Sequence, residues 1–154
     1  MPHITPAHLD ALGYYTTRKH LMHVPQKYRQ TLLNNFDELM LNYSFQYHRV
    51  VVALSGSLLE VLLAMHLQEK CHVNKITHKG KHSKNIWQAS LYELIHFYTA
   101  KQLLPPPILR LCKAARLQRN FIHPGKEICE QVVLTPAGAQ ICFLAVLEVI
   151  NCLL

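Results

Sequence analysis

Four polar side chains that can handle phosphate and protons lie close together in the sequence, at Arg116, Arg119, Asn120 and His123. On a helix that turns about 100° per residue, all four fall within an arc of about 100° on one face. Guanidinium groups hold phosphate oxygens through paired hydrogen bonds, and imidazole transfers protons near neutral pH. The set therefore suits cleavage of RNA, which supplies its own 2′-hydroxyl as nucleophile and requires no metal. The spacing alone is more typical of an ordinary cationic cap at a helix C-terminus.

The two arginines differ in their distance from His123. Along a helix axis Arg119 lies about 6 Å from the histidine and Arg116 about 10 Å. We therefore expect Arg119 to be the partner of His123 and Arg116 to be a second phosphate contact. Asn120, on the same face, would orient the histidine or the phosphate.

The sequence RNFIHPG at 119–125 resembles the signature of the HEPN superfamily (higher eukaryotes and prokaryotes nucleotide-binding). That signature is an arginine, often followed by a polar residue such as asparagine, and then a histidine after four to six intervening residues. Arg119 is followed by Asn120 but leaves three residues before His123. Arg116 leaves six, which fits the spacing, but asparagine does not follow it. The stretches 53–60 and 94–109 are similar to uncharacterised bacterial branches of the superfamily. The resemblance covers 46–154, whereas 1–45 has no clear match.

The resemblance implies an all-α bundle and a metal-independent endoribonuclease of a toxin–antitoxin or other defence system. It also implies a homodimer in which two copies of the Arg–His face form one composite site. His123 would then be the general acid and base, and Arg119 and Arg116 would hold the scissile phosphate. An antitoxin or another defence protein is an expected partner. Two alternatives stay open: a catalytically inactive module that binds RNA or nucleotides, and a helical protein-interaction domain.

Glu60 lies in an otherwise apolar stretch and allows two interpretations. A buried carboxylate needs a partner, and the resemblance places a polar residue on this helix facing the arginine. A Glu60–Arg119 pair would hold the guanidinium in place. Alternatively, Glu60 faces solvent.

Positive charge is concentrated in one part of the chain. Residues 70–126 contain eleven lysines and arginines and a single acid, Glu93, although the whole chain has a net charge of only +7. Such a patch favours nucleic-acid phosphate as partner. We expect four lysines of the loop at 70–84 to bind RNA: Lys75, Lys79, Lys81 and Lys84.

The remaining chemistry-bearing residues indicate neither a cofactor nor a metal. Cys71, His72, His78 and His82 share the lysine-rich loop, but their spacing matches no standard zinc finger. The five cysteines form no CxxC pair, and no signal peptide opens the chain, so we expect reduced thiols in the cytoplasm.

Hydrophobic residues recur with helical spacing through nearly the whole chain, and 50% of the residues are hydrophobic. The pattern predicts helices over about 7–15, 26–43, 46–69 and 87–102, from the prolines at 105–107 to about 123, and from 135 to the end. Only 129–134 has the character of a strand. The stretch 50–67 carries a central carboxylate, which is costly in lipid, so we expect a buried core helix and no membrane association.

The predicted fold is therefore all-α, an up-and-down bundle of four to six helices. At 154 residues without an internal composition change, the chain is expected to form one domain over 1–154.

Overall fold

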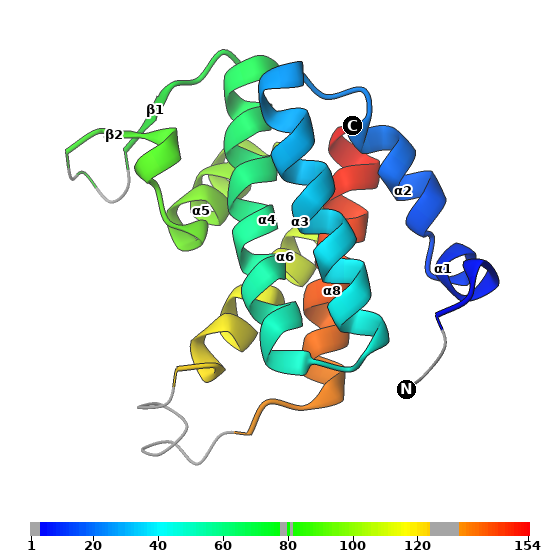
Figure 1. The fold of residues 1–154 in the computed structure, drawn as a ribbon. Coiled ribbons are helices and arrows are strands. Elements are labelled where there is room, and N and C mark those ends of the chain that lie inside the picture. Colours follow the sequence, from blue (N-terminus) through cyan, green and yellow to red (C-terminus); the bar gives the residue numbers. More distant parts are fainter. Residues whose placement is uncertain (1–3, 78–79, 81, 124–132) are drawn as a thin grey trace.

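The computed structural model describes residues 4–77, 80, 82–123 and 133–154, and these form an all-α bundle, which confirms the predicted fold class (Figure 1). In the described residues, the helices are α1 (Pro6–Ala11), α2 (Tyr14–Leu21), α3 (Gln26–Ser44), α4 (His48–Glu69), α5 (Leu91–Lys101), α6 (Pro106–Phe121) and α8 (Pro136–Leu153). A two-stranded antiparallel hairpin, β1 (Lys75–Ile76) with β2 (Lys84–Asn85), and a short 3₁₀ turn, η1 (Ile86–Gln88), join α4 to α5.

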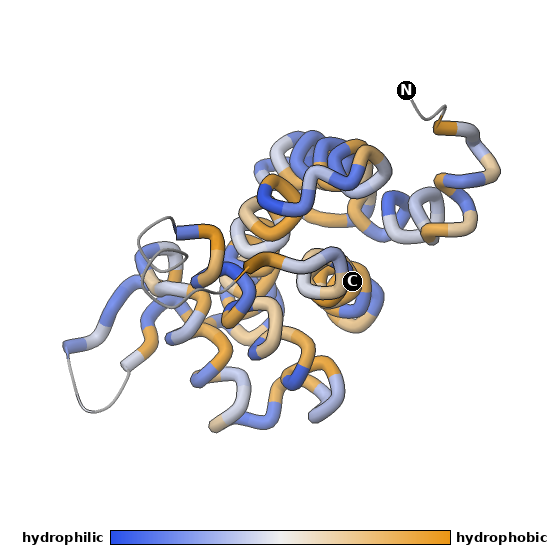
Figure 2. Tube along the Cα trace, turned by 90° about the horizontal axis from the view of Figure 1, so that it is seen from below, coloured by the Kyte–Doolittle hydropathy of each residue, from blue (hydrophilic) through white to orange (hydrophobic). Residues whose placement is uncertain are grey.

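The core is built around α4 and α8, which lie side by side (Figure 1). Half of the 22 residues of α4 are buried, and so are half of the 18 residues of α8. Figure 2 shows α8, next to the C label, as predominantly hydrophobic. Both helices are apolar and long enough to cross a membrane by length and composition. Within the described structure their apolar faces pack against each other and against α3 and α6.

Local capping signals fix where several helices begin. The hydroxyls of Thr5, Ser90 and Thr135 accept hydrogen bonds from the backbone N–H groups of the first turns of α1, α5 and α8. Proline stands in the first turn of α1, α6 and α8, where its missing N–H has no cost. From α3 onwards, the predicted helices therefore begin and end within about four residues of the observed ones.

The N-terminal region contains two helices where the sequence pattern predicts one. Gly13 adopts a left-handed conformation with φ of 74°, which a glycine tolerates and which separates α1 from α2. The bundle consequently has seven α-helices in its described part, one more than the upper expectation.

The segment between α4 and α5 is more ordered than the loop predicted there. Lys75 pairs with Asn85 and Ile76 with Lys84 across the hairpin. Of the stretch 129–134, the expected strand, only Val133 and Leu134 are described, and they are not in a strand; Cys129 lies outside the described residues.

Two of the free thiols belong to the core. Cys112 and Cys142 are buried between α6 and α8, and burial raises the pKa of both thiols to about 12. At neutral pH these side chains are protonated and act as small apolar residues.

Candidate functional site

The C-terminal end of α6 opens into a cavity of about 420 Å³ at the junction of α4, α5 and α6. Arg116, Arg119, Asn120 and His123 all line it, and so does Glu60. The structure thus brings together the five residues that the sequence singles out as catalytic candidates. α6 ends at Phe121, so His123 lies two residues past the helix and is solvent-exposed.

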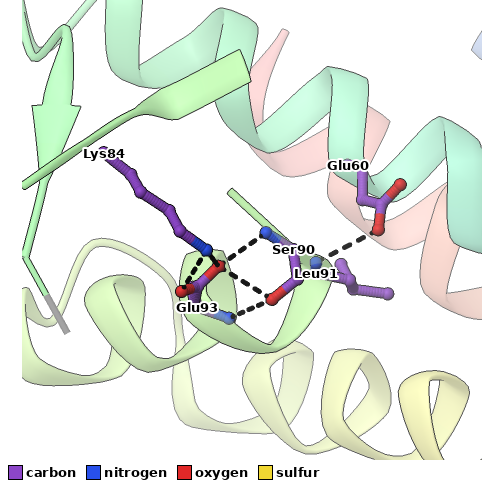
Figure 3. A network of polar contacts seen from close by, with 5 residues as sticks. All are labelled: Glu60, Lys84, Ser90, Leu91 and Glu93. Carbon is purple, nitrogen blue, oxygen red and sulfur yellow. Dashed lines mark hydrogen bonds and ion pairs between the residues drawn. The ribbon is translucent and has the colours of Figure 1, made fainter. Parts of the chain in front are cut away.

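Glu60 and Arg119 form an ion pair in which Arg119 Nη1 lies 2.5 Å from Glu60 Oε1. The same carboxylate oxygen accepts a hydrogen bond of 3.1 Å from the backbone N–H of Leu91, the first residue of α5 (Figure 3). Of the two interpretations of Glu60, the structure has the paired one. One oxygen therefore connects α4 to both α5 and α6.

The path of Arg119 across α4 depends on Gly56. A Cβ at this position would lie 2.7 Å from Arg119 Cδ, closer than real Cβ atoms approach other atoms, and 3.0 Å from Nε, a tight contact. Because Gly56 has no side chain, Arg119 lies directly against α4 and reaches Glu60, one turn further along. The Arg119 guanidinium donates to Glu60 through Nη1. Among the described residues, Nε and Nη2 have no hydrogen-bond partner. These two groups are available to a phosphate.

Arg116 is oriented by an aromatic ring. Its Cζ lies 5.0 Å from the centre of the Tyr92 ring, a cation–π distance. Tyr92 is 39% exposed, follows Leu91 in the first turn of α5 and lines the same cavity. The ring holds the Arg116 guanidinium at the cavity. No carboxylate of the described residues forms an ion pair with this guanidinium, so its charge is not neutralised.

The end of α6 is tied back to the start of α4. Arg49 Nη1 donates a 3.4 Å hydrogen bond to the carbonyl oxygen of Ile122, the residue before His123. With two arginines and Glu60, the cavity carries an excess positive charge before any charge on His123 is counted. This electrostatic balance favours an anionic ligand.

The first turn of α5, which forms one wall of the cavity, is stabilised by a capping box. Ser90 Oγ accepts from the Glu93 N–H, and the Glu93 carboxylate accepts from the Ser90 N–H (Figure 3). Lys84 Nζ lies 2.9 Å from Glu93 Oε1. The Lys84 ammonium, together with the Ser90 N–H, lowers the pKa of the Glu93 carboxyl to about 2.

The lysines expected to bind RNA do not form one equivalent set. Lys75 is exposed on β1, whereas Lys84 on β2 is engaged by Glu93. Lys79 and Lys81 lie outside the described residues. So does His78, one of the four loop residues weighed above as metal ligands. Among the residues that the structure describes, no group of three His, Cys, Asp or Glu side chains is placed to hold a metal ion.

Sequence reasoning missed two contributors to the site. Gly56 is four residues before Glu60, so helical spacing alone puts both residues on one face of the helix. This spacing could have indicated that an arginine side chain packs against Gly56 to reach Glu60. Tyr92 had no such signal, because it comes from α5 and reaches Arg116 only through the packing of α5 on α6.

A scan against protein-family models and searches of curated proteins and of solved structures found no match to this chain. The functional argument therefore depends on the residues of the cavity and their geometry.

Proposed function

We propose that the chain is a metal-independent endoribonuclease of the HEPN type, which cleaves RNA through attack by the 2′-hydroxyl. The observation that carries the proposal is the cavity at the end of α6. It gathers Arg116, Arg119, Asn120 and His123 around a guanidinium that Glu60 holds in position. A cytoplasmic role in a toxin or defence system, with an antitoxin or similar partner, belongs to the same proposal.

The chemistry assigns each side chain a task. The 2′-oxygen forms a bond to phosphorus and loses its proton to a histidine, while the bond to the 5′-oxygen breaks and that oxygen takes up a proton. The products are a 2′,3′-cyclic phosphate and a free 5′-hydroxyl. Arg119 and Arg116 stabilise the charge that builds on the phosphate oxygens, and Asn120 orients the histidine or the phosphate. Glu60 is a positioning residue that acts through Arg119.

Two proton transfers occur in this reaction, and His123 is the one histidine that lines the described cavity. A second chain would bring a second His123. The proposal therefore includes a homodimer whose two Arg–His faces form one composite site.

The test is cleavage of a labelled single-stranded RNA in the presence of EDTA. Wild type should release a product that ends in a cyclic phosphate. His123→Ala should lose roughly 10²- to 10⁴-fold in rate, as expected when a proton-transfer group is removed, with RNA binding largely retained. Arg119→Ala should lose a similar factor and also bind RNA more weakly, because it contacts the phosphate before and during reaction.

An RNA with a single 2′-deoxyribose at the scissile position provides the control for mechanism. It should bind but remain uncut, because the attacking hydroxyl is missing. Cleavage of this substrate, or full activity of His123→Ala, would contradict the proposed chemistry.

A second candidate function is an RNA- or nucleotide-binding module without catalysis. Two features favour it. The cavity has one histidine for two proton transfers, and the ion pair with Glu60 partly neutralises the charge of Arg119. Binding of RNA that weakens with salt, without cleavage under any condition, would select this candidate.

A further inference from the structure

Trp87 is an aromatic side chain whose exposure the cavity does not explain. It is the only tryptophan of the chain and is 42% exposed on η1, just after the hairpin. Its indole Nε1–H donates a 3.0 Å hydrogen bond to Gln68 Oε1, so its polar group is already satisfied. What remains in contact with water is ring carbon, which is unfavourable unless a partner covers it.

The ring is held firmly in this position. It stacks on Tyr28 with a centroid separation of 5.5 Å and an interplanar angle of 28°. Tyr28 donates its hydroxyl to the same Gln68 oxygen at 2.8 Å, and the Trp87 backbone N–H donates to Asn85 Oδ1. Because α3, α4 and the hairpin all contribute contacts, the indole forms a preorganised surface, and a ligand that stacks on it need not order the ring first.

The surroundings of Trp87 carry excess positive charge. Between positions 70 and 92 the described residues include exposed Lys70, Lys75 and Lys84 and no acid. The two nearest carboxylates are both paired, Glu69 with Lys27 at 2.8 Å and Glu93 with Lys84. Lys84 is thus paired, whereas Lys70 and Lys75 have no carboxylate partner among the described residues. A firmly held aromatic ring near such lysines is the combination that binds single-stranded nucleic acid, because bases stack and phosphates pair.

Trp87 also lies close to the cavity along the chain. Ser90, three residues later, lines the cavity, so the two Cα atoms are at most about 11 Å apart. Gln68, which holds the indole, lies eight residues beyond Glu60 on α4, or about 12 Å along the helix axis. One RNA strand of a few nucleotides can therefore contact both Arg119 and Trp87.

We propose that Trp87 is a base-stacking platform that holds single-stranded RNA beside the candidate active site, with the exposed hairpin lysine Lys75 contacting the phosphates. This inference rests on the proposed RNA substrate, but binding alone tests it. The His123→Ala variant allows binding to be measured without cleavage.

The fluorescence of the single tryptophan provides the test. Titration of His123→Ala with an oligouridylate of about 12 nucleotides should quench the Trp87 emission in a saturable way, because bases stacked on indole quench it. Anisotropy of a labelled copy of the same RNA defines saturation independently. A duplex of equal length, whose bases are stacked internally, should bind without comparable quenching.

Variants separate stacking from charge. Trp87→Ala should weaken oligouridylate binding by roughly 5- to 100-fold, the range found for loss of one stacked base, and Trp87→Phe should restore most of it. Tyr47→Ala, which removes a 58% exposed aromatic ring at the other end of α4, is the matched control and should leave binding unchanged.

Each result distinguishes this inference from the proposed function. Saturated binding without quenching, or equal quenching by the duplex, overturns the platform even if the wild type cleaves RNA. A change of Trp87 emission with phosphatidylserine vesicles and none with RNA overturns it in favour of a membrane surface. Quenching with no cleavage by wild type supports the platform and contradicts the ribonuclease.

Discussion

Arg119 crosses α4 at Gly56 and ends on Glu60, so the position of its guanidinium depends on two residues one helical turn apart. The glycine supplies space and the glutamate supplies charge. Since glycine lowers helix stability by about 1 kcal/mol relative to alanine, its presence within α4 is a cost that the arginine contact offsets.

Gly56→Ala should therefore separate stability from activity. The new Cβ displaces Arg119 from α4, so we expect RNA cleavage to fall by about 10-fold or more if phosphate positioning requires the guanidinium. The melting temperature should change little, because the alanine improves the helix while the contact with Arg119 is lost. Calorimetry and a cleavage assay on the same preparation measure both.

Gly138→Ala is the matched control for this variant. A Cβ at Gly138 meets the Gln118 side chain, at 2.9 Å from its Cδ, and Gln118 does not line the cavity. Its cleavage rate should equal that of wild type. If both glycine variants lose activity equally, the loss comes from general distortion of the bundle.

At the scale of single elements, α5 depends on its first turn. Ser90 and Glu93 form the capping box, and Lys84 from β2 adds an ion pair to the same carboxylate. The hairpin and the helix that borders the cavity are thus stabilised by one charged group.

The contribution of Glu93 should disappear in acid. Its pKa in the folded protein is about 2, below the ordinary value of 4.5, so the charged form stabilises the fold above about pH 4.5, and this stabilisation is lost as the pH falls towards 2. Glu93→Gln should be less stable than wild type at neutral pH, with a difference that shrinks across this range. Urea unfolding at several pH values measures it.

The four lysines at 75–84 should make RNA affinity depend on salt concentration. Each neutralised phosphate contributes about 0.7 to the slope of log K against log salt for single strands, so replacing Lys75, Lys79, Lys81 and Lys84 by alanine should flatten that slope by up to about 3. Lys84 should contribute least because it is paired with Glu93. Lys19→Ala on α2 is the control, and an unchanged slope in the fourfold variant would remove the hairpin from the RNA-binding surface.

The elements were largely predictable because their signals are local. Thr5 with Pro6, Ser90 with Glu93 and Thr135 with Pro136 mark helix starts through contacts within four residues. The hairpin escaped prediction because its two-residue strands carry no periodic pattern. The Glu60–Arg119 pair stayed undecided from sequence, because it depends on how α4 is rotated toward α6, and this rotation is set by packing between residues 59 apart in sequence.

At the scale of the whole molecule, α4 and α8 form the core (Figure 1). The cavity lies at the C-terminal end of α6, beside the N-terminal turn of α5. The cavity lies where three helices converge, and most of its lining residues belong to α4, α5 and α6. The cavity of one chain holds a single histidine, and the proposed dimer would supply the second proton-transfer group, His123 of the other copy.

Mixing experiments test the dimer. If both His123 side chains are required, an equal mixture of wild type and His123→Ala, after exchange of subunits, should retain about one quarter of the wild-type activity per total protein. Independent sites predict about one half. Sedimentation at micromolar concentration should show a dimer, and a fully active monomer would exclude the composite site.

The double use of the Glu60 oxygen has a consequence for observing the site. The Leu91 amide and Arg119 share one acceptor, so a ligand that draws Arg119 away changes the electron density left for that amide. The Leu91 proton is a natural spectroscopic indicator of occupancy: its chemical shift and its rate of exchange with deuterium should respond when an anion binds Arg119, without contact between the anion and the amide itself. The amide proton of Leu91, at the start of α5, thereby reports on ligand binding at Arg119 in the neighbouring helix α6.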